Sequence, residues 1–253
     1  MRVFHDTWLL FVPHMKATLR NPIWLMVDLF MPICYMLLFT PLLANLPTVS
    51  GGQTAGALAT FTPGLLIMMS LYSVTFVGYN LLFDLRQGVI ERLRVTPVSR
   101  LALLLGRVLH NVTILLLQSV LLLLVAWLLG LRANLLGILA TFILLVLVGL
   151  LMASLSYALA LAMKNENTMG PALQVLTTPL LLLSGIILPL NLAPPQIHAI
   201  ADVNPLAYAV YAARDLFIGD FADVKVLQGF VFLTIMALLV LCWAASNFRR
   251  AIS

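Results

Sequence analysis

Long apolar runs alternate with short polar segments along the whole chain. Each run is roughly 20 residues long, the length that an α-helix needs to cross a hydrocarbon core about 30 Å thick. Charged residues, prolines and glycines mark the ends of the runs. The pattern predicts six membrane-spanning helices, at about residues 23–44, 58–80, 104–129, 135–162, 169–189 and 226–246. In the fifth of these, Pro179 and Pro189 predict a kink or a re-entrant turn.

Composition supports a membrane protein. Of the 253 residues, 62% are hydrophobic and 9% are charged, and the mean hydropathy is +1.09. A soluble domain is about a quarter charged. Charges scattered near the start of the chain do not match a cleavable signal peptide, so the first apolar run is expected to stay in the mature protein. Cys34 and Cys242 lie within apolar runs, where we expect neither a disulfide nor a metal site.

The distribution of basic residues predicts the orientation. Cytoplasmic loops of membrane proteins carry an excess of lysine and arginine. With both termini in the cytoplasm, that side holds Arg2, Lys16, Arg20, Arg86, Arg92, Arg94, Arg100, Arg107, Lys164, Arg249 and Arg250. Only Arg132, Arg214 and Lys225 then lie outside. We therefore predict a multi-pass protein with both termini cytoplasmic. Topology and lipid contact explain the net charge of +5, which indicates no nucleic-acid partner.

Two segments outside the predicted spans show patterns of their own. Within residues 1–22, apolar side chains recur at helical spacing, at Phe4, Trp8, Phe11, Met15 and Leu19. This stripe predicts a helix lying in the membrane interface with a bend at Pro13; a frayed tail is the alternative. External residues 190–225 mix proline breaks with short apolar stretches, which favours re-entrant or amphipathic helices that dip into the outer leaflet.

The sequence lacks the motifs of an intramembrane enzyme and of an ATPase. Its only glutamates, Glu91 and Glu166, lie in predicted cytoplasmic loops, and its histidines are dispersed along the chain. A P-loop requires glycine directly before its lysine, whereas every lysine here follows a methionine or a valine. Residues 49–53 read VSGGQ, close to the LSGGQ signature of ABC ATPases, but we interpret them as a flexible external turn.

Ionisable residues are scarce within the predicted spans. Asp28 is expected near the cytoplasmic end of the first span and Arg107 near the start of the third. The span centres hold nothing more polar than Gln118 and Gln174, whereas ion-coupled transporters commonly keep ionisable residues at that depth. The pattern favours an apolar or amphipathic cargo that is recognised by shape and aromatic contact.

The predicted cytoplasmic connection 81–103 concentrates charge between two apolar runs. Its apolar residues fall on one helical stripe, made of Leu82, Leu85, Val89 and Leu93. They predict a short amphipathic helix that ends at Pro97. Two interpretations remain open at this point. The helix docks on a partner protein, or the segment is a solvated loop whose arginines satisfy topology and lipid headgroups.

Two stretches resemble one family of membrane proteins. Residues 86–107, RQGVIERLRVTPVSRLALLLGR, resemble the first cytoplasmic loop of ABC-2 type transporter permeases, including the Gly-basic pair at Gly106 and Arg107. The stretch SGIILPLNLAPPQIHAIADVNPLAYAVYAARDLF resembles that family's segment between the fifth and sixth spans, including Asn204, Pro205 and Arg214. Both lie where a six-span topology places them. The resemblance covers essentially the full chain and is nearest to the branch of daunorubicin-type drug exporters.

The resemblance implies an all-α integral membrane protein of the ABC-2, or type V exporter-like, kind, with one transmembrane domain over residues 1–253. Two such subunits would form the pathway in a bacterial plasma (inner) membrane, and two cytoplasmic ABC ATPases would drive it. ATP and Mg²⁺ would bind the ATPase, and this chain would hold no cofactor. The cytoplasmic loop would be the coupling helix, fixed in register by charge complementarity. The implied coupling residues are Arg86, Gly88, Glu91, Arg92, Arg94 and Pro97.

An aromatic stripe on the second predicted span is the candidate cargo surface. It consists of Tyr72, Phe76, Tyr79 and Phe83. Such a stripe also serves helix packing or interfacial anchoring, although the resemblance favours a path for cargo. The leading hypothesis is a permease subunit that exports a hydrophobic or amphipathic drug, lipid or lipid-linked compound. A non-transporting scaffold or assembly factor and an ion-coupled secondary transporter are the alternatives.

Overall fold

The predicted all-α fold class is confirmed over the described part of the chain, which contains no strand. The computed structural model describes residues 2–20, 23–45, 54–75, 77–86, 100–163, 165–186, 196, 201 and 203–252. Its helices are α1 (Arg2–Arg20), α2 (Ile23–Ala44), α4 (Thr54–Thr75), α5 (Val77–Arg86), α7 (Arg100–Leu128), α8 (Leu135–Met163), α9 (Glu166–Leu182), α11 (Pro205–Ile218) and α12 (Val224–Ile252).

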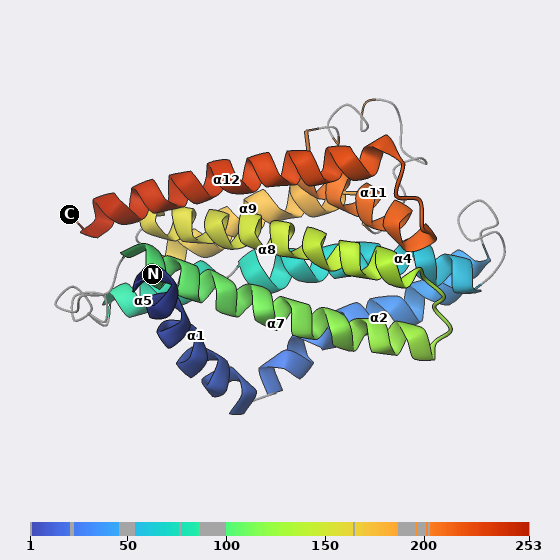
Figure 1. The fold of residues 1–253 in the computed structure, drawn as a ribbon, viewed down its shortest axis with the longest axis horizontal. Helices are drawn as coiled ribbons and strands as arrows, with labels where there is room; N and C mark the ends of the chain where they lie inside the picture. Colours follow the sequence, from blue (N-terminus) through green and yellow to red (C-terminus); the bar gives the residue numbers. More distant parts are fainter. Residues whose placement is uncertain are drawn as a thin grey trace.

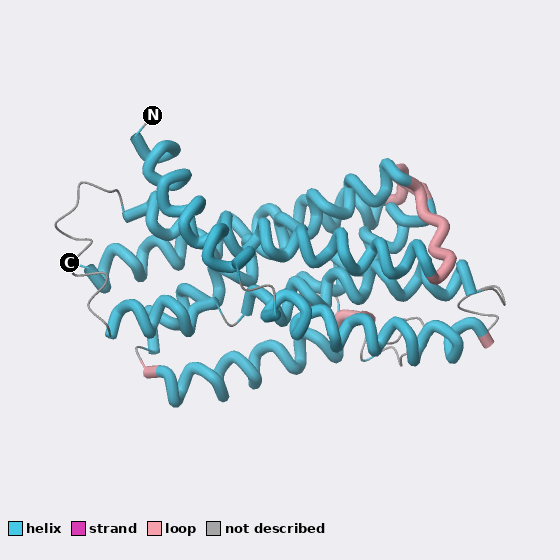
Figure 2. Tube along the Cα trace, turned by 90° about the horizontal axis from the view of Figure 1, so that it is seen from below, coloured by secondary structure: helices cyan, strands magenta, loops and turns pink. Residues whose placement is uncertain are grey.

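The helices form an elongated bundle. In Figure 1, α4, α7, α8, α9 and α12 follow its long axis, whereas α1 leaves the bundle at an angle. Helix α8 packs against α4, α5, α7, α9, α11 and α12, so it is the centre of the fold. Both termini and α5 lie at one end of the bundle, and Figure 2 shows the same elongated shape and the same position of the termini from below.

Five of the described helical segments are long and apolar enough to cross a membrane. They are Leu25–Ala44, Thr54–Phe83, Gly106–Leu128, Leu135–Met163 and Val224–Asn247. The chain is therefore a multi-pass membrane protein by helix length and composition. The predicted fifth span, 169–189, is not among these segments. Its helix α9 has 17 residues, fewer than the roughly 20 that a span requires.

The ends of three predicted spans need correction. Helix α2 matches the predicted first span, but the second predicted span, 58–80, is too short at both ends, because α4 begins at Thr54 and α5 continues to Arg86. Leu81 and Leu82 are buried, because α5 packs on α8. The predicted connection 81–103 therefore loses residues at both ends to α5 and α7. The last helix also runs beyond the predicted residue 246, to Ile252.

A hydroxyl from α8 contacts both α4 and α5. The Ser156 hydroxyl accepts a hydrogen bond from the Gly78 N–H (2.9 Å) and donates one to the carbonyl of Thr75. Polar backbone groups in an apolar interior need such partners. Ala153 and Ala160, on the same helix, are fully buried, so its small side chains serve close packing within the subunit.

The segment predicted to be external contains a packed helix. Asn204 caps the start of α11 with its side chain, Pro205 occupies the first turn, and Gly219 ends the helix at φ +94°. A Cβ on Gly137 of α8 would lie 1.8 Å from the Leu216 carbonyl oxygen, so α8 and α11 are nearly in backbone contact. Helix α11 also packs on α4 and α12, which makes it part of the bundle.

Helix α1 confirms the predicted N-terminal helix and rules out a frayed tail for residues 2–20. It continues through Pro13 and packs on α7, where the Thr18 hydroxyl lies 3.0 Å from Nε2 of His110. Trp8 is 58% exposed. An amphipathic helix with an exposed aromatic residue is typical of an interfacial helix, and the interfacial position stays a prediction.

Candidate functional site

A cavity of about 400 Å³ lies between α2 and α4. We call it the α2–α4 cavity. It is lined by Val27, Asp28, Met31, Pro32, Tyr35, Met68, Met69, Tyr72 and Ser73. Its volume lies within the range of small-molecule sites, about 300–1,000 Å³. The lining is mostly apolar and aromatic, with one carboxylate.

Two side chains, Gln118 on α7 and Ser73 on α4, hold that carboxylate in place. The side-chain amide of Gln118 on α7 donates a hydrogen bond to a carboxylate oxygen of Asp28 (3.1 Å). The Ser73 hydroxyl on α4 donates to the Gln118 side-chain carbonyl (3.1 Å). Gln118 is fully buried. The network therefore fixes Asp28 on α2 relative to both neighbouring helices.

Asp28 lies near the start of its own span, Leu25–Ala44, as predicted. Its hydrogen bond to Gln118 also places it level with the middle of the span Gly106–Leu128, which the sequence did not predict. Figure 1 shows why the two residues meet: α1 packs near the N-terminal end of α7, so that α2 begins only part-way along the bundle. The prediction used only the position of Asp28 within its own helix, whereas its neighbours depend on the register between α2 and α7.

The described residues of the predicted aromatic stripe have different surroundings. Tyr72, 43% exposed, lines the α2–α4 cavity, whereas Phe83 on α5 lines a different cavity. Phe76 lies outside the described residues. The Tyr79 hydroxyl would be 2.4 Å from a Cβ on Gly170 of α9, so Tyr79 marks a close helix contact. The cargo role of the four residues stays a prediction.

The second cavity, of about 250 Å³, lies near the end that holds the termini. It is lined by His14, Val77, Phe83, Arg107, His110, Asn111 and Tyr157. The rings of His14 and His110, far apart in sequence, have centroids 5.9 Å apart. The Asn111 side-chain amide donates to the Tyr157 hydroxyl (3.1 Å), which joins α7 to α8. No group of three or more metal-ligating side chains occurs among the described residues.

The predicted external motif ties three helices together. The Asn204 amide donates to the Leu180 carbonyl of α9 (2.8 Å). Arg214 of α11 is 9% exposed and donates to the backbone carbonyls of Thr60 (3.0 Å) and Gly185 (2.8 Å). Burial lowers the pKa of Arg214 to about 10, which leaves the guanidinium protonated at neutral pH. The motif therefore holds α11 on α4 and on the end of α9.

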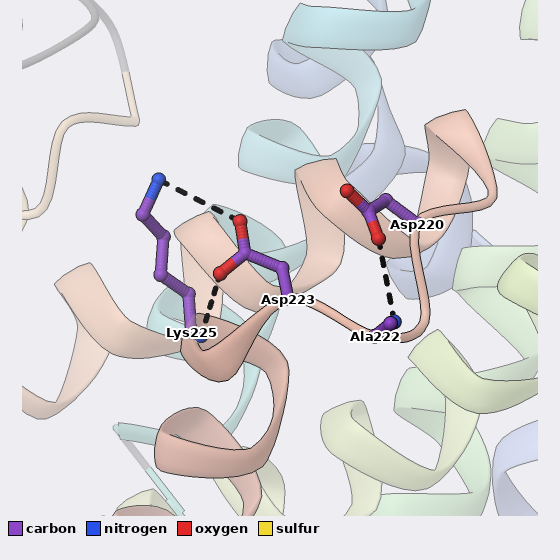
Figure 3. A network of polar contacts seen from close by, with 4 residues as sticks. All are labelled: Asp220, Ala222, Asp223 and Lys225. Carbon is purple, nitrogen blue, oxygen red and sulfur yellow. Dashed lines mark hydrogen bonds and ion pairs between the residues drawn. The ribbon is translucent and has the colours of Figure 1, made fainter.

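Acidic residues cluster at the turn between α11 and α12. Asp223 accepts a hydrogen bond from the Lys225 N–H (2.9 Å), and Asp220 accepts one from the Ala222 N–H (3.3 Å) (Figure 3). One carboxylate oxygen of Asp215, on α11, is buried and has no hydrogen-bond partner among the described residues. Burial raises the pKa of Asp215, and the charge of Lys225 opposes that shift.

The predicted coupling residues fall mostly outside the described residues. Arg86 is the last residue of α5, at the bundle end that holds both termini (Figure 1). The other five, Gly88, Glu91, Arg92, Arg94 and Pro97, lie in the undescribed connection between α5 and α7. Their role stays a prediction.

Comparison with known proteins decides the family. The sequence profile of the ABC-2 type transporter family matches residues 5–218. The chain belongs to the ABC-2 type transporter family. Among similar proteins, ycf38 of Pyropia yezoensis, named as a transport permease, is 30% identical over 202 residues, covering 78% of this chain and 69% of that protein. The daunorubicin resistance ABC transporter permease protein DrrB1 of Streptomyces coeruleorubidus is 26% identical over 207 residues, covering 81% and 72%.

Membership of this family confirms that the chain is the membrane subunit of a transporter. ABC-2 permeases are the membrane subunits of ABC transporters, and the ATPase is a separate subunit. The chain is therefore a transporter subunit that is not itself an enzyme, and its partner is an ABC ATPase. The hydrogen bonds from Ser73 to Gln118 and from Gln118 to Asp28 were not predicted from the sequence. Each residue was visible as a polar position in an apolar run, but only the packing of three helices brings them together.

Proposed function

We propose that this permease exports a hydrophobic or amphipathic cargo, driven by an ABC ATPase that docks at the bundle end holding both termini. The family match over residues 5–218 carries the proposal, because permeases of this family work with a separate subunit that hydrolyses ATP. The complex contains two permease subunits and two ATPases in a bacterial inner membrane, with both termini cytoplasmic. With the five spans given above, the predicted span 169–189, which includes most of α9, brings the number of crossings to six.

The arrangement of the helix ends supports this docking site. Helices α5 and α7 flank the undescribed connection 87–99, and Arg86 and Arg100 are the described residues next to it. Helix α5 lies at the same end as the N- and C-termini (Figure 1). A short charged helix in this connection would transmit ATPase closure to the second and third spans, because it is continuous with both. Glu91 and Arg92 would fix its register on the ATPase by charge complementarity.

The α2–α4 cavity supports the cargo assignment. Tyr35, Tyr72 and three methionines give it an aromatic and polarisable lining, which suits a flat apolar body. The outer faces of α2 and α12 expose large apolar side chains, including Phe30, Leu38 and Leu239. These faces meet lipid or the second permease subunit.

Co-purification with the partner ATPase tests the docking proposal. The double variant Glu91→Arg, Arg92→Glu should lose ATPase binding and stimulated hydrolysis, because both charges that fix the register are reversed. Arg132→Glu, a reversal in the exposed turn between α7 and α8, is the matched control and should retain both. If the double variant assembles and stimulates hydrolysis as the wild type does, the docking site is wrong.

The alternatives give different results in proteoliposomes. A scaffold or assembly factor would bind its partner and show no cargo-stimulated ATP hydrolysis. An ion-coupled transporter would move cargo along an ion gradient without ATP. The position of Asp28 within a membrane-spanning segment makes this second control necessary, since ionisable residues inside the membrane serve such transporters.

A further inference from the structure

The α2–α4 cavity contains an acceptor site that the proposed function does not use. The hydrogen bond from Gln118 occupies one carboxylate oxygen of Asp28. Asp28 forms no ion pair with any basic residue that the structure describes, and no lysine, arginine or histidine is among the described residues that line the cavity. A carboxylate within a membrane-spanning segment is costly unless a cation or proton accompanies it.

The backbone of α2 adds a second acceptor at the same place. Pro32 lies inside α2, four residues after Asp28, and both residues line the cavity. Proline has no N–H, so the carbonyl of Asp28 lacks its usual intrahelical donor. The carboxylate and this carbonyl together suit an ammonium group, which donates several hydrogen bonds and carries the compensating charge.

The remaining lining suits an apolar body attached to that ammonium group. Tyr35 and Tyr72 offer aromatic faces, to which cations and flat rings are attracted. The Tyr35 ring lies 5.9 Å from that of Phe39, which in turn lies 5.7 Å from Phe61, so aromatic side chains continue away from the cavity along α2 and α4. Because no basic side chain lines the cavity, a phosphate-bearing lipid amine would leave its phosphate unpaired.

We propose that the α2–α4 cavity binds a lipophilic organic amine in its protonated form, with Asp28 as the counter-charge and Tyr35 and Tyr72 around its apolar body. The role of this ligand as cargo rests on the proposed function, whereas its binding does not. The site revises the sequence-based expectation that cargo is recognised by shape and aromatic contact alone.

Two matched probes test the charge at this site. At neutral pH, 9-aminoacridine is protonated, whereas acridine is a neutral ring of nearly the same shape. Equilibrium dialysis with the purified full chain should show a preference for 9-aminoacridine of about tenfold, the size expected for a partly screened ion pair. Asp28→Asn should abolish that preference and change acridine affinity less than about twofold. Asp28→Glu should retain it.

Asp220→Asn is the control, because it removes one carboxylate at the turn between α11 and α12, away from the cavity. It should behave as the wild type. Tyr72→Leu is the second variant if Asp28→Asn fails to fold; Tyr72 is partly exposed, so the substitution should be tolerated, with the preference reduced about threefold. Equal affinity of the wild type for both probes, or an undiminished preference in Asp28→Asn, would overturn the inference.

This result is separable from the proposed function. Dialysis uses the permease alone and needs no ATPase. A permease that assembles with its ATPase and drives transport but shows no charge preference contradicts only the amine site. A permease that prefers 9-aminoacridine through Asp28 but never stimulates an ABC ATPase contradicts only the proposed function.

Discussion

Replacing Arg214 should destabilise the bundle more than replacing any exposed arginine. Arg214 is nearly buried, and its guanidinium joins α11 to the Thr60 carbonyl of α4 and the Gly185 carbonyl after α9. Arg214→Met keeps most of the side-chain length and removes both donors. Arg214→Lys keeps the charge, but an ammonium group reaches the two carbonyls less well than a planar fork does.

The magnitude follows from these two bonds. Hydrogen bonds from a charged donor contribute about 1.5–3 kcal/mol each. Part of that gain offsets the cost of burying the guanidinium, a cost that Arg214→Met no longer has. We therefore expect a net loss of about 2–4 kcal/mol for Arg214→Met and roughly half for Arg214→Lys. For a chain of this size, the larger loss corresponds to a fall in Tm of about 5–15 °C.

Thermal unfolding of the purified protein in detergent, followed by tryptophan fluorescence, measures the effect. Arg132→Met removes an exposed arginine and should change the Tm by less than about 1–2 °C. The reasoning is refuted if Arg214→Met and Arg132→Met unfold at the same temperature. It is also refuted if Arg214→Lys is as damaging as Arg214→Met.

Three further predictions concern packing and charge. Gly137→Ala should lower expression and Tm strongly, because its Cβ would meet a backbone carbonyl of α11. Gly149→Ala should have a milder effect, because its Cβ would meet only side-chain atoms, at 3.1 Å or more. In the same thermal assay, Ser156→Ala should cost about 1–3 kcal/mol by leaving backbone groups unpaired. Ser154→Ala removes a buried hydroxyl without a partner among the described residues and should be neutral or stabilising. Because the pKa of Asp215 is raised in the folded state, its contribution to stability should increase as the pH falls through that pKa, and Asp215→Asn should remove this part of the pH dependence.

The sequence predicts the elements of this fold well because each span is a local property. An apolar run of sufficient length specifies a crossing helix without reference to its neighbours. The first span, 23–44, therefore matches α2. Predicted ends are less accurate where tertiary packing extends a helix, as at α5, which buries Leu81 and Leu82 beyond the apolar run. At α9, the predicted span is longer than the described helix.

The candidate sites are harder to predict because they depend on register between helices. Asp28 is near the start of its own span in sequence, but the packing of α2 on α7 places it beside Gln118, level with the middle of the third span. Tyr72 and Phe83, which periodicity places on one stripe, line different cavities. Asn204 and Arg214 are visible as a motif, although their bonds to α9 and α4 require the folded chain.

In the proposed function, ATP hydrolysis by a separate subunit drives cargo through this permease. Proteoliposomes that contain the permease and its ABC ATPase, loaded with an amphipathic amine such as 9-aminoacridine, measure this directly. We predict transport that requires ATP, stops with a hydrolysis-deficient ATPase and fails with Glu91→Arg, Arg92→Glu in the permease. Transport that continues without ATP and follows an imposed ion gradient would contradict the claim.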